Sequence, residues 1–345
     1  MTDLQGDVKT APPSDSVVPY AGPGTRTARL ADDRRRRFSI SKPFIYLLLI
    51  SYLLIVVYPM VWLLYSSLKP DQQIFLKPFA PPNPANVSGG DIRWAWDSDL
   101  TYDYVGYALR YSLTDLEWRN FSNAWTKGSF DRYFFNSILI TSTTVIVTTF
   151  LAAMAAYALS RFVFPGAKGI YFYFLAGLMI PLQLAIVPLF FQLRGMGLLD
   201  NRFGLFLVYL AFGFPFSIFV LTGFFRSLPA SLHESALLDG ATEFQAFWHV
   251  MLPLARPGLI TVAIFLFLGN WNEFFVAFMT ISGRGGDNIQ TLPLGLAKIT
   301  IVSNYRSDWG MAFAGLVLMM LPTLIAYIFL QKHLTKGITA GAIKG

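Results

Sequence analysis

Long apolar runs separated by polar segments dominate the chain. Six runs are long enough to cross a bilayer, and they cover residues 43 to 68, 133 to 160, 169 to 193, 203 to 225, 257 to 283 and 309 to 331. Five carry no charged residue, and the run 257 to 283 carries only Glu273. Crossing about 30 Å of hydrocarbon takes roughly 20 helical residues. Since the helices of a soluble protein need a polar face, the pattern predicts an all-α polytopic membrane protein with six transmembrane helices.

Charge is scarce and unevenly placed. Only 14% of residues are charged, whereas soluble domains carry about a quarter. With the N-terminus inside, the cytoplasmic segments hold 15 Lys and Arg and the short external loops hold 5. The segment 69 to 132 is long enough to escape this rule. Both termini are therefore predicted to be cytoplasmic, and the net charge of +7 is explained by topology rather than by nucleic acid.

The polar ends and the first external segment differ in composition. Residues 1 to 42 are expected to form a disordered cytoplasmic tail, too long for a cleaved signal peptide. Residues 69 to 132 combine prolines with many aromatic residues, which predicts an external cap whose aromatic side chains form its own core or contact a sugar or a partner. Residues 133 to 331 are expected to form a transmembrane core of spans two to six, and residues 332 to 345 a cytoplasmic tail. The chain has no cysteine, which excludes disulfides and thiol chemistry.

Two features predict how the spans pack. Span two is rich in Thr and Ala, small residues that allow close helix contact in lipid. Spans three, four and six contain prolines, which we expect to interrupt them at Pro181, Pro188, Pro215 and Pro322. Such breaks persist in membranes only where protein or a water-filled cavity satisfies the freed backbone groups. The bundle is therefore expected to enclose a path.

Residues 226 to 256, between spans four and five, are predicted to form two short helices. Pro229 suits the first turn of one helix, Gly240 suits a left-handed C-cap, and Thr242 with Gln245 resembles a capping box opening the second. An apolar stripe at i, i+3, i+4 and i+7 follows, formed by Phe244, Phe247, Trp248 and Met251. These features alone also fit an amphipathic pair lying on the lipid surface.

The same segment resembles the EAA motif of permeases of binding-protein-dependent ABC importers. The matching residues are Glu234, Ser235, Ala236, Asp239, Gly240, Ala241, Val250, Leu252 and Pro253. Ser235 stands where the family usually has alanine, which is a small-for-small change. The resemblance implies that the segment is a coupling helix docked on an ATPase subunit, with Glu234 at the contact and Gly240 shaping the turn.

Further stretches resemble the sugar-uptake branch, typified by the MalG type of permease of maltose transport. The C-terminal tail matches a segment that reaches between the two ATPase subunits, here represented by Thr339, Gly341, Lys344 and Gly345. The last external loop matches one that enters the binding protein's sugar cleft, through Thr291, Leu292, Pro293, Leu294 and Gly295. The stretch Tyr157 to Arg161 and the pair Asn136 and Ser137 also look like family positions. Residues 80 to 117 have no counterpart in the resemblance.

Span five holds a polar patch beyond mid-membrane, formed by Asn270, Trp271, Asn272, Glu273 and Phe274. On a continuous helix, Asn270, Glu273 and Phe274 share one face, and a carboxylate should face the bundle because it is costly in lipid. Three readings of Glu273 remain open: a substrate-contacting or gating site, a packing hydrogen bond to another span, or proton coupling. A proton-coupled secondary transporter is therefore the rival class.

No stretch fits the phosphate-binding pattern G-x-x-x-x-G-K-[ST], so the chain is predicted to need a separate ATPase. The resemblance implies a transport subunit rather than an enzyme. Such a subunit carries no cofactor of its own and relies on ATP and Mg bound by the partner ATPase. Implied partners are an ATPase dimer, a second permease of the MalF type and a soluble sugar-binding protein, in a bacterial or archaeal inner membrane. A permease for another small solute is the alternative. The three histidines lack metal-ligand spacing and are expected at protein interfaces.

Overall fold

The computed structural model describes residues 41 to 76, 78 to 79, 82, 116 to 281, 288 to 302 and 308 to 342. The predicted N-terminal tail lies outside these residues except for Ser41 and Lys42, which begin a helix, and most of the predicted external cap also lies outside them. Within the described ranges every regular element is a helix, so the all-α prediction is confirmed there. Four helices are long and apolar enough to cross a membrane, and two bent helix pairs raise the number to as many as six.

The first apolar run forms α2 (Ser41–Ser66), which α3 (Asp71–Leu76) follows closely. The chain divides into two units near residue 60, so α2 is described by itself and the remainder as the second unit. In that second unit a short helix, α6 (Arg119–Thr126), leads into span two. Asn120 ties this entry to the segment that follows α2, because its Nδ2 donates to the backbone oxygens of Ser67 and Lys69 at 2.9 Å each.

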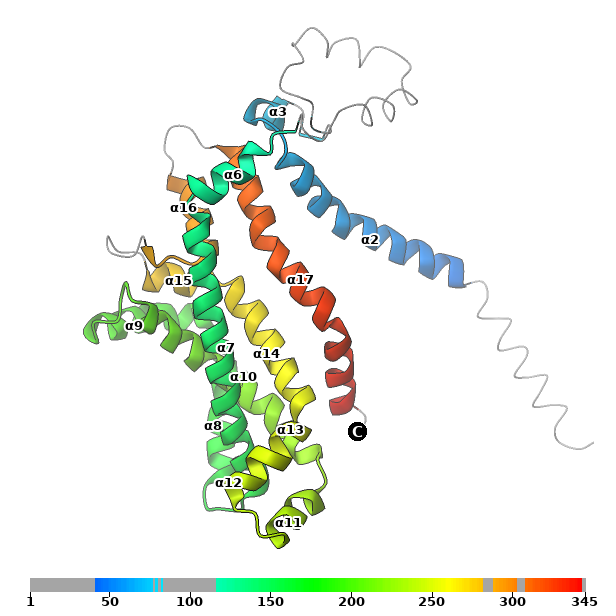
Figure 1. Cartoon of the computed structure of the whole chain (residues 1–345), viewed down its shortest axis with the longest axis vertical. Coiled ribbons are helices and arrows are strands. Elements are labelled where there is room, and N and C mark those ends of the chain that lie inside the picture. The colour runs from blue at the N-terminus through cyan, green and yellow to red at the C-terminus, as the bar shows by residue number, and fades with distance from the viewer. Residues whose placement is uncertain are drawn as a thin grey trace, which may run out of the picture. The chain divides into compact units, whose positions relative to one another are not determined.

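Span two is α7 (Phe130–Arg161), an unbroken helix of 32 residues. At 1.5 Å per residue it is about 48 Å long, more than the roughly 30 Å of bilayer hydrocarbon. Its small side chains are buried against neighbouring helices, which confirms the packing prediction for span two; they include Thr144, Thr148, Ala152, Ala153 and Ala156. Figure 1 shows α7 running from α6 at one end to α11 and α12 at the other.

Span three is broken. It consists of α8 (Ala167–Met179) and α9 (Leu182–Gly195), which meet at 102°. Ile180 and Pro181 between them are extended, since proline lacks an N–H donor and disfavours helical geometry in the residue before it. The prediction of proline breaks is correct at Pro181. It is wrong for the other three prolines, which lie inside continuous helices: Pro188 in α9, Pro215 in α10 and Pro322 in α17.

Span four is α10 (Arg202–Ser227), which packs mainly against α7. Span five departs from the prediction of one helix over 257 to 283, because α14 (Arg256–Trp271) ends early and α15 (Phe275–Thr280) follows after a break. Then come α16 (Leu292–Val302) and α17 (Trp309–Ala342). Helix α17 therefore continues well into the segment predicted as a cytoplasmic tail.

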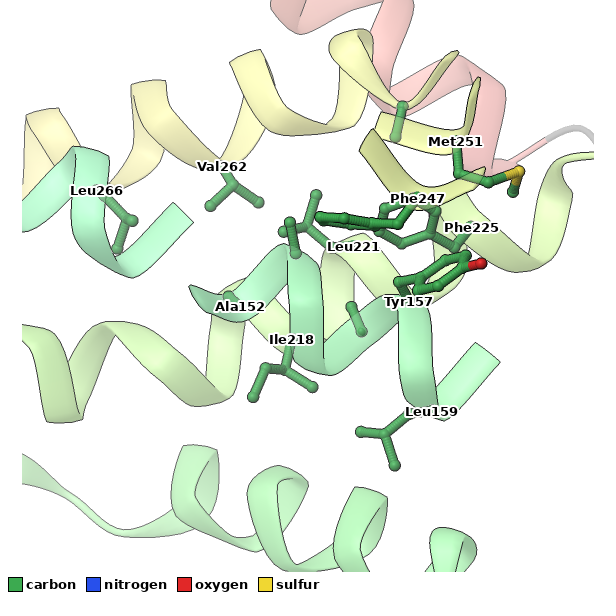
Figure 2. Packing of buried hydrophobic residues seen from close by; sticks show 13 residues of the cluster. Ala152, Tyr157, Leu159, Ile218, Leu221, Phe225, Phe247, Met251, Val262 and Leu266 are labelled. Carbon is green, nitrogen blue, oxygen red and sulfur yellow. The ribbon is translucent and has the colours of Figure 1, made fainter. Parts of the chain in front are cut away.

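The three central helices approach closely at Gly213. A Cβ atom there would lie 2.9 Å from Leu266 Cδ2 and 3.1 Å from Thr148 Cγ2, so glycine lets α10, α14 and α7 meet. Beyond this contact the core continues toward the segment 226 to 256. Figure 2 shows Tyr157, Phe225 and Phe247 packed together there, from three different elements. This core forms the base on which that segment rests.

Candidate functional site

The segment between spans four and five folds into the predicted helix pair, here called the capped hairpin (residues 229 to 254). Its first helix is α11 (Ala230–Leu238), and Gly240 turns the chain with φ +85°. Thr242 then opens α12 (Glu243–Gln245) with a capping box. Its N–H donates to Gln245 Oε1 at 2.8 Å, and the Gln245 N–H donates to Thr242 Oγ1 at 3.3 Å. The glycine turn and the capping box are both confirmed.

The second half of the hairpin differs from the prediction. After α12 the chain forms a π-helical turn, η2 (Ala246–Met251), and then α13 (Leu252–Leu254). In a π-helix the hydrogen bonds run from i to i+5, so the α-helical spacing that predicted one apolar stripe does not apply. Phe247 and Met251 are buried, whereas Phe244 and Trp248 are 63% and 45% exposed and stack on each other. The predicted stripe is therefore wrong for half of its residues.

The EAA-like residues divide between the surface and the base of the hairpin. Glu234, Ser235, Asp239 and Gly240 are exposed, while Ala236 is buried. The remaining four are half-buried, namely Ala241, Val250, Leu252 and Pro253. Sequence reasoning missed Leu238, the last residue of α11, whose side chain is 89% exposed. Its position just before an Asp-Gly turn is the signal that marks it as the tip of the hairpin.

One carboxylate joins the hairpin to span two. Glu243 Oε2 accepts the Tyr157 hydroxyl at 3.1 Å and lies 2.9 Å from Nε2 of His233 on α11. The Tyr157 ring is 4% exposed and packs against the rings of His233 and Phe247. Sequence reasoning placed Tyr157 among family positions and His233 at an interface, but it missed Glu243.

Arg161 fixes the same end of α7 to α10. Its Nη2 donates to the backbone oxygens of Phe225 at 2.7 Å and Leu228 at 2.8 Å. These oxygens belong to the C-terminal end of α10, where helical carbonyls lack partners within the helix. The end of α7 that carries Tyr157 is therefore itself held firmly against its neighbour.

The segment Thr291 to Gly295, predicted as an external contact loop, is buried and begins α16 instead. Ser137 Oγ accepts the Leu292 N–H at 2.7 Å, and a Cβ on Gly295 would lie within the ring of Tyr133. As these residues lie, they present no surface to a soluble partner. The apolar sequence Leu-Pro-Leu explains the difference, because its side chains can be buried against α7 without losing hydrogen bonds to water.

Asn136 holds the chain just before that segment. Its Nδ2 donates to the backbone oxygens of Asn288 and Gln290 at 3.0 Å each, and its Oδ1 accepts from Arg202 Nη2 at 2.9 Å. Asn136, Arg202 and Asn288 border a hollow of about 490 Å³ that is also lined by Asp131, Arg132 and Phe135. Arg132 and Arg202 are both exposed at its rim.

The polar patch of span five lies at the break between α14 and α15. Trp271 is buried and donates from Nε1 to the Met319 oxygen at 3.1 Å, whereas Asn272 is exposed. Glu273 accepts the backbone N–H groups of Val276 at 2.8 Å and Ala277 at 3.0 Å. It thus caps α15, and the prediction that Asn270, Glu273 and Phe274 share one face of a continuous helix is wrong.

A second hollow, of about 370 Å³, opens beside this break and is here called the aromatic hollow. Its walls combine rings with two polar side chains, from Tyr209, Phe212, Phe216, Phe265, Asn270 and Glu273. Within the described part of the chain, the buried Nδ2 of Asn270 has no hydrogen-bond partner. The hollow therefore combines flat apolar faces with two polar side chains.

The predicted tail contacts are divided by the limit of the described residues. Thr339 and Gly341 lie in the last turns of α17, whereas Lys344 and Gly345 lie outside the described residues.

The structure combines broken apolar helices beside a partly polar hollow with a capped helical hairpin at one end. This combination is typical of a membrane transport subunit that is driven by a partner protein. The family described as "Binding-protein-dependent transport system inner membrane component" matches residues 148–340, more than half of the chain. The chain belongs to this family. It is a permease subunit of a sugar ABC importer, not itself an enzyme, and its ATP is bound by a partner ATPase.

Similar proteins agree with this assignment. The chain is 38% identical to the diacetylchitobiose uptake system permease protein NgcG of Streptomyces coelicolor, over 92% of this chain and 93% of that protein. It is 37% identical to the trehalose transport system permease protein SugB of Mycobacterium tuberculosis, over 61% and 76% respectively. A solved bacterial ABC transporter involved in import of the polysaccharide alginate has the same fold, with a TM-score of 0.65, 21% identity and coverage of 91% of this chain and 99% of that one.

Proposed function

We propose that this chain forms half of the membrane path for an oligosaccharide. Its capped hairpin docks on the ATPase and is moved by the conformational change of the ATPase. The observation that carries the proposal is the hairpin itself. It presents Glu234, Leu238 and Asp239 outward from a base formed by the core around Tyr157. Glu234 lies one helical turn before the exposed Leu238, and Asp239 directly follows it, so the tip of the hairpin combines an apolar side chain with two acidic ones.

The aromatic hollow is the proposed sugar-contacting stretch of the path. Flat rings such as Phe212 and Phe265 provide faces that pack against the C–H surface of a sugar ring. Asn270 and Glu273 supply the hydrogen-bonding groups that fix orientation, as polar groups do in otherwise apolar sites. Because Glu273 also caps α15, sugar contact and the packing reading of this residue are compatible.

Three sugar classes are proposed as substrates, two from the names of similar permeases and one from the resemblance to MalG-type permeases. They are diacetylchitobiose, trehalose and the maltose-like glucosides implied by the resemblance to MalG-type permeases. The proposed partners are an ATPase dimer, a second permease and a soluble binding protein, with both termini of this chain in the cytoplasm. The surface around Arg132 and Arg202 is the proposed site of binding-protein contact, in place of the buried residues 291 to 295.

Copurification followed by reconstitution tests the proposal. A tagged chain should bring down an ATPase, a second permease and a binding protein. The reconstituted complex should take up one of radiolabelled diacetylchitobiose, trehalose or maltose only when ATP is supplied inside. Uptake by the chain alone that a proton uncoupler abolishes would refute the proposal and support a proton-coupled transporter.

A further inference from the structure

We propose that Glu243 is a positioning residue that fastens the capped hairpin to span two, so that force applied to α11 reaches α7. The inference rests on the proposed function, in which the hairpin docks on an ATPase. Glu243 lies outside the EAA-like residues and has no assigned role. Its carboxylate bonds both helix α11 and helix α7 at the same atom, Oε2.

Helix α11 needs such a fastening because it has few neighbours. It packs chiefly against η2, and most of its EAA-like side chains face outward. The link from His233 to Glu243 spans the Gly240 turn and joins the two halves of the hairpin through side chains. It adds to the backbone bonds that close the turn, from Gly240 N–H to the Leu237 oxygen and from Ala241 N–H to the Ala236 oxygen, at 3.0 Å each. Without this side-chain link the turn would bend when a partner moves α11. With the link, the movement of α11 is transmitted to the rest of the hairpin.

Tyr157 is suited to transmit this movement to α7, because its ring is rigidly packed. Its ring is enclosed by aromatic rings from three other segments, including Phe225 at 5.8 Å and Phe247 at 5.1 Å between centroids. Only its hydroxyl reaches the carboxylate, and hydrogen bonds to ionised acceptors are roughly twice as strong as neutral ones. One turn further on, Arg161 anchors the same helix end to α10. The clasp formed by Glu243, His233 and Tyr157 therefore acts on a fixed base.

The test compares Glu243→Ala, Glu243→Gln and Tyr157→Phe in the complete reconstituted complex. Three quantities are measured: ATPase subunit copurified, ATP hydrolysed, and uptake of radiolabelled diacetylchitobiose, trehalose and maltose. We expect Glu243→Ala to copurify the ATPase at the wild-type level. Its uptake per ATP hydrolysed should fall on the order of tenfold, within the usual range for coupling between sites. Tyr157→Phe should lower the same ratio, because it removes the hydroxyl and leaves the ring.

Two comparisons separate positioning from general damage. Glu243→Gln should restore most of the ratio, because its amide oxygen can still accept the Tyr157 hydroxyl. Tyr171→Phe is the matched control, since the Tyr171 hydroxyl has no recorded hydrogen bond to a residue that the structure describes; it should leave the ratio unchanged. The double variant Tyr157→Phe with Glu243→Ala should be no worse than Glu243→Ala alone, as expected for one shared interaction.

A wild-type ratio for Glu243→Ala would overturn the inference, and so would loss of ATPase copurification, which would make Glu243 a docking contact instead. Independent, multiplying losses in the double variant would also overturn it. Failure of the proposed function is distinguishable, because the wild-type chain itself would then bring down no ATPase.

Discussion

The hydroxyl of Tyr209 donates to Glu273 Oε2 at 2.9 Å, which joins helix α10 to the break in span five. The same carboxylate accepts two backbone N–H groups at the start of α15. Glu273 therefore satisfies three donors that would otherwise lack partners in an apolar setting. The break between α14 and α15 is therefore stabilised by the hydrogen bonds of one carboxylate.

Removing this carboxylate should destabilise the fold more than removing its tyrosine partner. Glu273→Gln keeps one accepting oxygen but turns an NH₂ group toward N–H donors, and a buried unsatisfied donor costs about 1 to 3 kcal/mol. Tyr209→Phe removes a single hydrogen bond, worth about 1 kcal/mol. Thermal unfolding of the purified complex in detergent should thus show a larger decrease in Tm for Glu273→Gln. The reverse order would show that α15 is not capped by Glu273.

The topology derived from the charge distribution can be tested on described residues. The chain has no cysteine, so Ser122→Cys in α6 and Ser231→Cys in α11 each introduce a single thiol at an exposed position. A membrane-impermeant maleimide should label Ser122→Cys in intact cells and Ser231→Cys only after permeabilisation. The opposite pattern would invert the chain in the membrane and remove the hairpin from the ATPase side.

The capped hairpin was predictable because its signals are local. The left-handed turn requires glycine at Gly240, and the capping box depends only on Thr242 and Gln245 three residues apart. Such interactions are encoded within a few neighbouring residues, so no knowledge of the remaining fold is needed. The long apolar runs are equally local signals, and they gave the helices α2, α7, α10 and α17.

The parts that failed depend on tertiary contacts. The break after Trp271 has no proline or glycine to mark it, and it exists because Glu273 finds donors on α15 and α10. Burial of Leu292 depends likewise on Ser137, 155 positions earlier in the chain. Glu243 carried no signal of its own, because its partners His233 and Tyr157 come together only after folding.

The tip of the hairpin should contribute to ATPase docking without contributing to stability. Leu238→Asp replaces an 89% exposed side chain, so the Tm should remain within the error of measurement. Apolar contact with the ATPase would be lost, and copurified ATPase should decrease several-fold. Glu234→Lys, which reverses an exposed charge on the same helix, should act in the same direction. The exposed Lys168→Ala is the control and should copurify the ATPase normally.

Gly240 should tolerate side chains according to backbone geometry alone. No atom lies within 4 Å of a Cβ placed there, so the left-handed φ of +85° is the only obstacle. Gly240→Asn should retain most transport, Gly240→Ala should lose part of it, and Gly240→Pro should lose all. Proline also removes the N–H that donates to the Leu237 oxygen at 3.0 Å.

Membrane insertion, measured by the yield of folded protein in the membrane fraction, should be similar for these three variants, because the six apolar runs are unchanged. Full uptake and full ATPase copurification by Gly240→Pro would mean that the hairpin is only a connector, and the proposed function would lose its main support.

Asn136 should be essential for holding the segment that leads into α16. Introducing a negative charge at this position should be at least as damaging as truncating the side chain. The side chain is 6% exposed, donates to two backbone oxygens and accepts from Arg202. Asn136→Asp keeps the shape and the Arg202 contact but places a carboxylate oxygen 3.0 Å from carbonyl oxygens. Asn136→Ala removes the donor and the acceptor but adds no charge. We therefore expect Asn136→Asp to lower the Tm at least as much as Asn136→Ala.

Arg202→Ala is the matched control for that comparison, because it removes the partner of Oδ1 and a longer bond of 3.4 Å to the Asn288 oxygen, and leaves both Nδ2 bonds in place. Its Tm should stay near the wild-type value, since Arg202 is exposed and water can replace the guanidinium. Hydrogen exchange in residues 288 to 302 should quicken in both Asn136 variants and not in Arg202→Ala. If Arg202→Ala proves the most damaging of the three, the arginine rather than the amide holds this segment in place.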